Sequence, residues 1–268
     1  MSNAAPDKNT DTPLGLVFVI TAYVLWGFLP LYMKGVAHVP SIEVVAHRVI
    51  WSVPVAGGVL IVLGRTRDLR EALQTPRMLG MACLTAALIS MNWAIYVWAI
   101  ASGHAIDAAL GYYINPLFSI LLGGLLLGER LSRLQLAAIG LAAVAVAILT
   151  LDSGRFPWVA LSLTFTFGLY ALAKKRLPIG PNQGFLLEVL ILLAPALAYL
   201  VYLIMTGQNH FGQGVPFNTW MLVGCGVVTA VPLIFYANGA KRLRLSTIGI
   251  LQYIAPTMIF LCAVLVFD

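Results

Sequence analysis

Residues 14–33 read LGLVFVITAYVLWGFLPLYM, a run of 20 residues that contains no Asp, Glu, Lys or Arg. An α-helix needs about 20 such residues to cross the hydrocarbon core of a bilayer, because each residue advances it by about 1.5 Å. Lipid offers the backbone no hydrogen-bond partners, so a spanning segment must satisfy its own amides as a helix or within a closed barrel. The run therefore predicts a transmembrane helix.

Eight further apolar runs follow the first one, and charged residues, Gly or Pro separate them. The chain thus predicts an all-α integral membrane protein with nine transmembrane helices. The nine runs cover residues 14–33, 42–63, 78–100, 108–127, 135–151, 158–173, 183–204, 219–238 and 247–267.

The composition excludes a water-soluble globule. Of the 268 residues, 60% are hydrophobic and 10% are charged, whereas soluble domains carry about 25% charged residues. The outer surface must therefore face the lipid bilayer. A net charge of +6 would favour nucleic-acid binding in a soluble protein, but here the basic residues lie in short connections between apolar runs. No nucleic-acid partner is predicted.

The distribution of basic residues predicts the orientation. With the N-terminus in the cytoplasm, 13 of the 16 Lys and Arg residues fall on the cytoplasmic side. The opposite side receives Lys34 and Arg155, and Arg48 falls within the second run. Cytoplasmic connections of membrane proteins carry an excess of Lys and Arg, so this split favours a cytoplasmic N-terminus.

Prolines reveal an internal repeat. Pro40 and Pro54 fall on Pro181 and Pro195 at an offset of 141 residues, and Pro116 falls on Pro256 at an offset of 140. Pro within a span frees a carbonyl that a neighbour must satisfy, so such coincidences indicate shared architecture. Five spans separate equivalent positions, and an odd number inverts the second copy.

The repeat predicts three parts in the chain. Residues 1–13 form a polar cytoplasmic tail, residues 14–151 a first five-helix repeat, and residues 158–268 a second, inverted repeat that lacks its last helix. We therefore expect an inverted-repeat bundle of nine helices here and ten helices in the complete protein. Two copies of opposite sidedness are the geometric basis of alternating access.

Several motifs carry a family resemblance. They are YVLWGFLPLYMK at 23–34, AHRVIWS at 46–52, GYYINPL at 111–117, GERL at 128–131, RLRLST at 242–247 and QYIAPT at 252–257. In this order they resemble the RarD branch of the EamA-domain transporters, in the drug/metabolite transporter superfamily, over nearly the whole chain. The resemblance implies a ten-helix, inverted-repeat permease of the bacterial cytoplasmic (inner) membrane with a central cavity. The chain departs from this pattern in its absent last helix.

The resemblance also bears on the substrate, without fixing it. RarD proteins carry a chloramphenicol-sensitivity label, and family likeness favours export of a small metabolite. We expect a small-molecule substrate, either an amino-acid-like metabolite or an amphenicol-like drug.

Four ionisable residues lie within the apolar runs: Glu43, His47 and Arg48 in the second, and Glu188 in the seventh. Each costs at least about 2.5 to 3.5 kcal/mol to insert, so each needs a partner or a wet cavity. Glu43 and His47 are four residues apart and can contact each other directly. At an offset of 141, His47 falls on Glu188. The hypothesis is that His47 and Glu188 line the substrate path and couple transport to protons; the alternative is interfacial or structural pairing.

Amide and aromatic side chains offer further substrate contacts. A pocket for a mixed polar and apolar ligand needs a few polar groups in a largely hydrophobic lining. The alternatives are interface anchors for Trp and Tyr, and helix-to-helix hydrogen bonds for Asn. The candidates are Trp26, Asn92, Trp93, Tyr96, Tyr113, Asn115, Gln252 and Tyr253.

Other classes of protein and of site are less favoured. The sequence contains neither an HExxH motif nor a Gly-x-Ser-x-Gly elbow, so we expect no enzyme. Cys83, Cys225 and Cys262 have no CxxC spacing, so we expect no disulfide framework, metal or cofactor. A passive channel or a membrane scaffold tolerates the same composition and stays open as an alternative. Glycines in and near the fourth run, residues 108–127, indicate close helix packing or a homodimer.

Overall fold

The computed structural model describes residues 11–102, 104–153, 156–262 and 265. Most of the predicted polar tail, residues 1–10, and the last part of the ninth run lie outside these residues. Every regular element in the described part is a helix, which confirms the predicted all-α fold. Six of its segments are long and apolar enough to cross a membrane by length and composition.

The helices follow the nine predicted runs closely. The first run is split into α1 (Pro13–Gly27) and α2 (Leu29–Lys34), and the last into α11 (Leu245–Leu251) and α12 (Ile254–Cys262). The short α4 (Thr66–Gln74) lies in a connection. The remaining helices are α3 (Ser41–Val62), α5 (Pro76–Ala101), α6 (Ala105–Leu127), α7 (Arg133–Ser153), α8 (Trp158–Arg176), α9 (Pro181–Met205) and α10 (Pro216–Ala240).

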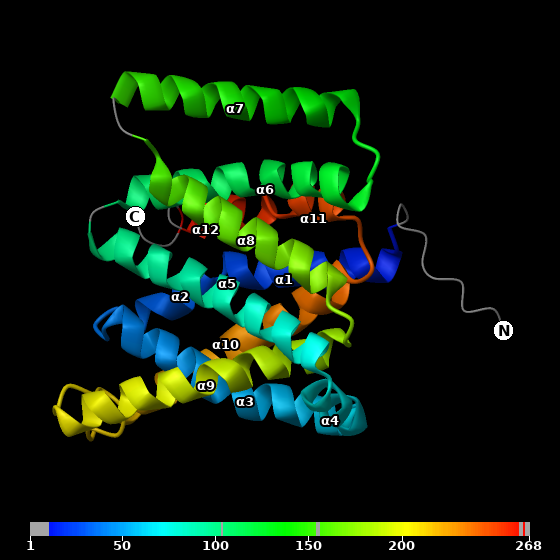
Figure 1. Cartoon of the computed structure of the whole chain (residues 1–268). Helices are drawn as coiled ribbons and strands as arrows, with labels where there is room; N and C mark the ends of the chain where they lie inside the picture. Colours follow the sequence, from blue (N-terminus) through cyan, green and yellow to red (C-terminus); the bar gives the residue numbers. More distant parts are fainter. Residues whose placement is uncertain (1–10, 103, 154–155, 263–264, 266–268) are drawn as a thin grey trace.

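Eight membrane segments of the described chain pack in a closed ring. α1 packs on α10, α10 on α3, α3 on α9, and α9 on α5. From there α5 packs on α8, α8 on α6, and α6 on α11, and α11 and α12 return to α1. The remaining long helix, α7, packs against α6 and lies outside the ring (Figure 1). The centre of the ring is the place where a buried site can form.

The order of the ring has a two-fold pattern. Exchanging α1 with α8, α3 with α9, α5 with α10, and α6 with α11–α12 gives the same order of neighbours. The prolines follow the same exchange. Pro40 directly precedes α3 and Pro181 opens α9, while Pro54 and Pro195 lie inside these two helices.

The two ends of the bundle differ in their polar contacts. At one end, called the basic end below, Arg244 pairs with Asp11, and Lys241 donates a hydrogen bond to the Leu177 carbonyl. At the opposite end, His210 is hydrogen-bonded to the Glu43 carboxylate. The α1 N-terminus and the α10–α11 connection meet at the basic end, where the Thr12 amide donates to the Arg242 carbonyl.

Two of the helical segments in the ring are broken. α1 gives way to α2 at Phe28, where Pro30 occupies the first turn of the new helix. α11 gives way to α12 at Gln252 and Tyr253, just before Pro256. Pro cannot donate the next intrahelical hydrogen bond, which favours a break at these places. Their exchange partners, α8 and α6, are unbroken.

Candidate functional site

An aromatic cluster fills the centre of the ring in its basic half. It consists of Tyr23, Trp26, Phe167, Tyr170 and Tyr236, from α1, α8 and α10. The Tyr236 ring centroid lies 5.6 Å from that of Trp26 and 6.2 Å from that of Phe167. Because α8 and α10 lie across the ring from each other, these contacts close the centre on this side.

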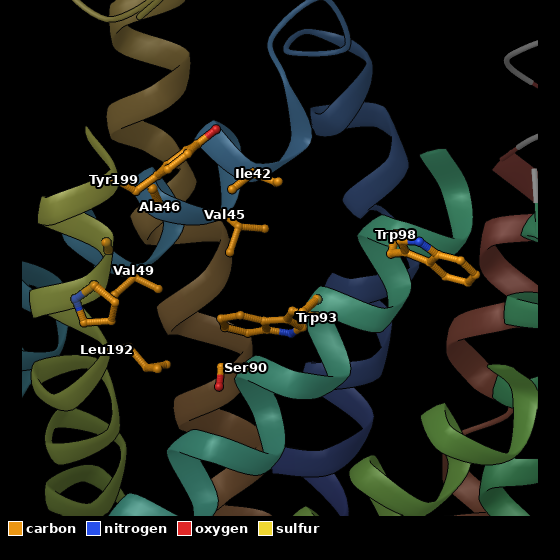
Figure 2. Close-up of a pocket in the computed structure, with 12 residues that line it drawn as sticks. Ile42, Val45, Ala46, Val49, Ser90, Trp93, Trp98, Leu192 and Tyr199 are labelled. Carbon is orange, nitrogen blue, oxygen red and sulfur yellow. The ribbon is translucent and has the colours of Figure 1, made fainter. Parts of the chain in front are cut away.

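Two cavities lie beyond the cluster, toward the opposite end. The larger has a volume of about 440 Å³ and lies between α3, α5 and α9 (Figure 2). Its lining is almost wholly apolar and includes Ile42, Val45, Val49, Trp93, Leu192 and Tyr199. The smaller, of about 310 Å³, lies between the α2–α3 connection, α3 and α5, and its lining includes Met33, Val36, Val44, Val45, Arg48, Trp93 and Tyr96.

Val45 and Trp93 line both cavities, so the two meet at this pair. Figure 2 shows the Trp93 indole reaching from α5 to a position below Val45. The indole ring also lies next to Arg48, whose guanidinium carbon is 5.1 Å from the ring centroid. One tryptophan therefore separates an apolar space from a charged one.

Arg48 brings the charge to the smaller cavity. Its Nε donates a hydrogen bond to Thr229 Oγ1 at 2.8 Å, across the α3–α10 contact. No carboxylate of the described residues lies within ion-pair distance of its guanidinium. Sequence reasoning did not include Arg48 among the site residues, although a charge within an apolar run is itself a signal of function.

His47 lies deep in α3 and is 1% exposed. Its Nδ1 accepts a hydrogen bond from Trp51 Nε1 at 3.2 Å, and its ring centroid lies 5.0 Å from that of Phe211. Its Nε2 is buried without a hydrogen-bond partner among the described residues. With Nδ1 as the acceptor, the neutral imidazole carries its proton on Nε2, and it can gain a second proton only at Nδ1, in place of the Trp51 hydrogen bond.

The predicted direct contact between Glu43 and His47 gives way to another pairing. Both oxygens of the buried Glu43 carboxylate accept from His210, at 2.7 Å from its amide and 2.8 Å from Nδ1. His210 belongs to the α9–α10 connection, and nothing in its local sequence marks it as a partner for Glu43. The pair fastens this connection over the end of α3.

Glu188 forms a buried ion pair. Its Oε1 lies 2.8 Å from Lys174 Nζ, and both side chains are 3% exposed. The Tyr170 hydroxyl donates to Glu188 Oε2 at 3.3 Å. Glu188 thus joins α8 to α9 in the basic half, and it is not among the residues that line the two cavities.

Two of the predicted amides occupy different environments. Asn92 donates to the Leu163 carbonyl at 3.0 Å and to Thr166 Oγ1 at 2.8 Å, which joins α5 to α8. Asn115, which is 1% exposed, has an Oδ1 atom without a partner among the described residues.

The break between α11 and α12 holds the remaining predicted residues. Gln252 is buried there, and the neighbouring Tyr253 hydroxyl donates to the Tyr113 carbonyl at 3.2 Å. The Tyr113 side chain itself is 53% exposed. Of the predicted contacts, the structure thus gathers Trp93 and Tyr96 at the cavities and Trp26 in the aromatic cluster.

Glu129, the acid of the GERL motif, caps α11 at the basic end. Its carboxylate accepts from the amides of Leu245 at 2.6 Å and Ser246 at 2.9 Å. Lys175 Nζ lies 3.9 Å away. A buried carboxylate at a helix N-terminus satisfies amides that have no intrahelical partner, and it binds the end of α6 to the start of α11.

The charges around this cap shift two pKa values. Burial opposes ionisation of Asp11, but hydrogen bonds from the Arg244 amide, Thr247 and the Arg244 side chain outweigh it and lower its pKa. Burial, with the nearby charges of Lys174 and Lys175, lowers the pKa of Lys241 to about 8. In the described part of the chain, no group of three His, Cys, Asp or Glu residues could hold a metal ion.

The sequence is similar to known bacterial transporters. The EamA-like transporter family matches residues 13–151. Protein RarD of Streptomyces exfoliatus is 43% identical over 253 residues, which cover 94% of this chain and 80% of that protein. An uncharacterized transporter of Vibrio cholerae serotype O1 is 43% identical over 98% of this chain and 86% of its own length.

A solved crystal structure shares this fold, with a TM-score of 0.68. The match covers 93% of this chain and 87% of the chain in that structure, at 19% sequence identity. The bacterial relatives and the apolar helices together make this chain a multi-pass protein of the bacterial inner membrane. The chain belongs to the EamA-like transporter family.

Proposed function

We propose that the protein is a secondary transporter that moves a small metabolite or drug-like molecule across the cytoplasmic membrane by alternating access. One observation carries the proposal: the centre of the ring holds cavities toward the opposite end and is filled by the aromatic cluster in the basic half. A site that is accessible from one side and closed on the other is one state of a carrier.

The second state follows from the two-fold pattern. We propose that residues 14–151 and 158–268 form two inverted repeats, which the unchanged order of helix neighbours and the matched prolines support. In inverted-repeat carriers, each repeat can adopt the conformation of the other. The breaks in the α1–α2 and α11–α12 segments would then pass to α8 and α6.

The proposed orientation in the membrane rests on the distribution of basic residues, and the proposed direction of transport rests on the resemblance to RarD proteins. The basic end lies in the cytoplasm by the positive-inside rule, so the cavities face outward. Export is the direction favoured by the resemblance to RarD proteins. A passive channel would need a continuous path, and the aromatic cluster blocks the centre of the ring, which supports a carrier over a channel.

Counterflow in proteoliposomes tests the proposal. Full-length protein would be reconstituted, and liposomes loaded with an unlabelled amino acid or chloramphenicol would be exposed to trace radiolabelled compound. A carrier gives transient accumulation above equilibrium, whereas a channel gives simple equilibration and a scaffold gives no protein-dependent flux. Either of the last two results would refute the proposal. Right-side-out and inside-out vesicles would then compare export with import.

Proton coupling is a separate part of the proposal, and we assign it to His47, because its buried imidazole can gain a proton at Nδ1 in place of the Trp51 hydrogen bond and its Nε2 has no partner among the described residues. Glu188 is held by Lys174 and would act structurally. His47→Gln should flatten the pH profile of transport, whereas Glu188→Gln should lower activity at all pH values. A wild-type pH profile in His47→Gln would rule out coupling through this residue.

A further inference from the structure

We propose that Arg48 binds a carboxylate of the transported molecule, and that the substrate is an organic monoanion with a compact apolar body. The inference rests on the proposed transport function and names the substrate class of the same site. It is drawn from the charge balance around Arg48, the geometry of its guanidinium and the shape of the two joined cavities.

The charge balance leaves Arg48 without a counter-charge among the described residues. Arg48 lies inside α3, a helix long and apolar enough to cross the membrane, and a charge there needs a counter-charge or a wet cavity. The carboxylates that could serve are engaged elsewhere: Glu43 with His210 and Glu188 with Lys174. Within the described residues, the counter-charge is therefore missing, and Arg48 lines a cavity.

The geometry of the guanidinium favours a carboxylate. Nε donates to Thr229, and the guanidinium carbon lies over the Trp93 ring, so two contacts restrain the side chain. The two terminal nitrogens remain for a ligand, and a planar pair of N–H donors matches a carboxylate bidentately. A phosphate dianion would favour a second cationic side chain beside Arg48. His47, the residue before Arg48 in the chain, contacts Trp51 and Phe211 instead.

The shape of the cavities specifies the rest of the ligand. The charged cavity of about 310 Å³ and the apolar one of about 440 Å³ meet at Val45 and Trp93. Together they fall within the range of small-molecule sites. A ligand with its carboxylate on Arg48 would place its apolar part along Trp93 and into the larger cavity, so charge and apolar body are both required.

Matched acid and amide pairs test the assignment. Phenylacetate and phenylacetamide, and hexanoate and hexanamide, differ in charge and hardly in shape. Binding to the purified full-length protein would be measured by thermal-shift titration and isothermal calorimetry. We expect the acids to bind wild type at least about tenfold more tightly than their amides, because charge-assisted hydrogen bonds contribute about 1.5–3 kcal/mol.

The variants separate the role of Arg48 from general effects of charge. Arg48→Gln should reduce acid binding to the level of the amides, and Arg48→Lys should retain part of the preference, because it keeps the charge but not the paired donors. Arg130→Gln removes an exposed arginine at the basic end and should leave binding unchanged. Should Arg48→Gln fail to fold, the wild-type preference and Arg48→Lys still decide the question.

Three results would overturn the assignment: amides that bind as tightly as acids, an acid preference that survives in Arg48→Gln, or no binding by any acid. Counterflow with radiolabelled phenylacetate separates this inference from the proposed function. Acid binding that depends on Arg48 but is not accompanied by counterflow would refute the transport function and still support the anion site. If a neutral compound shows counterflow and Arg48→Gln does not change it, the transport function is supported and the anion site at Arg48 is refuted.

Discussion

Lys174 and Glu188 show how single residues hold this bundle together away from the cavities. Glu188→Gln leaves the Lys174 ammonium buried without its counter-charge, so we expect a loss of about 3–5 kcal/mol of stability. The measurement is thermal unfolding of the purified protein in detergent. The double variant Glu188→Gln with Lys174→Met serves as the control and should recover most of the loss. Wild-type stability in the single variant would contradict the structural role.

Lys241 makes the stability of the basic end depend on pH. Its pKa is about 8 in the folded protein, below the ordinary value of 10.5 for a lysine, so between these two pH values the unfolded chain binds a proton that the folded protein does not. Stability should therefore rise as pH increases from about 8 to 10.5. Lys241→Gln keeps a donor for the Leu177 carbonyl and should lose this part of the rise. Melting temperatures would be measured from pH 7 to 11, and an equal rise in wild type and Lys241→Gln would refute the role of Lys241.

At the residue scale, the sequence identified which charges are buried but not their partners. Glu43, His47, Arg48 and Glu188 stand out because hydropathy marks them inside apolar runs. Their partners come from the tertiary fold: His210 lies in a connection more than 160 residues from Glu43 in sequence. Local spacing therefore predicted a contact between Glu43 and His47 that the structure replaces.

At the scale of elements, α3 and α10 are held close by one glycine. A Cβ at Gly226 would overlap the backbone carbonyl of Trp51, whereas a Cβ at Gly58 of α3 would meet nothing within 4 Å. Gly226→Ala should therefore force the helices apart and cost about 1–3 kcal/mol. Gly58→Ala should be neutral or stabilise by about 0.5–1 kcal/mol, because alanine favours the helix. Thermal unfolding compares them, and equal melting temperatures would contradict the close approach.

Hydropathy predicted the approximate limits of the apolar helices, because lipid allows few alternatives to an apolar helix. It did not predict where helices break. Pro54, Pro195 and Pro232 lie inside continuous helices, while Pro30 and Pro256 follow breaks. Whether a proline interrupts a helix depends on the neighbours that satisfy the freed carbonyl, and these are set by packing.

At the scale of the whole molecule, the ring predicts which positions a water-soluble reagent can reach. In a background without the three native cysteines, Val45→Cys at the joined cavities should react with a membrane-impermeant thiol reagent added from outside. Ala171→Cys, in the buried core of the basic half, should not react. Labelling of both positions from outside would show that the aromatic cluster does not close the centre.

The order of the ring could not be predicted from the sequence, although the repeat narrows it. The matched prolines predict which helices are equivalent, but neighbours such as α8 and α6 follow from contacts that involve Gly111 and Thr164, whose meaning appears only once the helices are packed. The cavities likewise depend on where α3, α5 and α9 fail to meet, a property of no single segment.

The Glu129 cap has a consequence for turnover. It joins the end of α6, in the first half of the chain, to the start of α11, in the second half, at the end of the bundle that would open in the second state of the proposed carrier. Parting α6 from α11 there strips two amides of their acceptor, at about 1–3 kcal/mol each unless water replaces it. In the proposed transport cycle, the carboxylate would therefore stabilise the outward-facing state without substrate, and its release would set a lower limit on the time of each cycle.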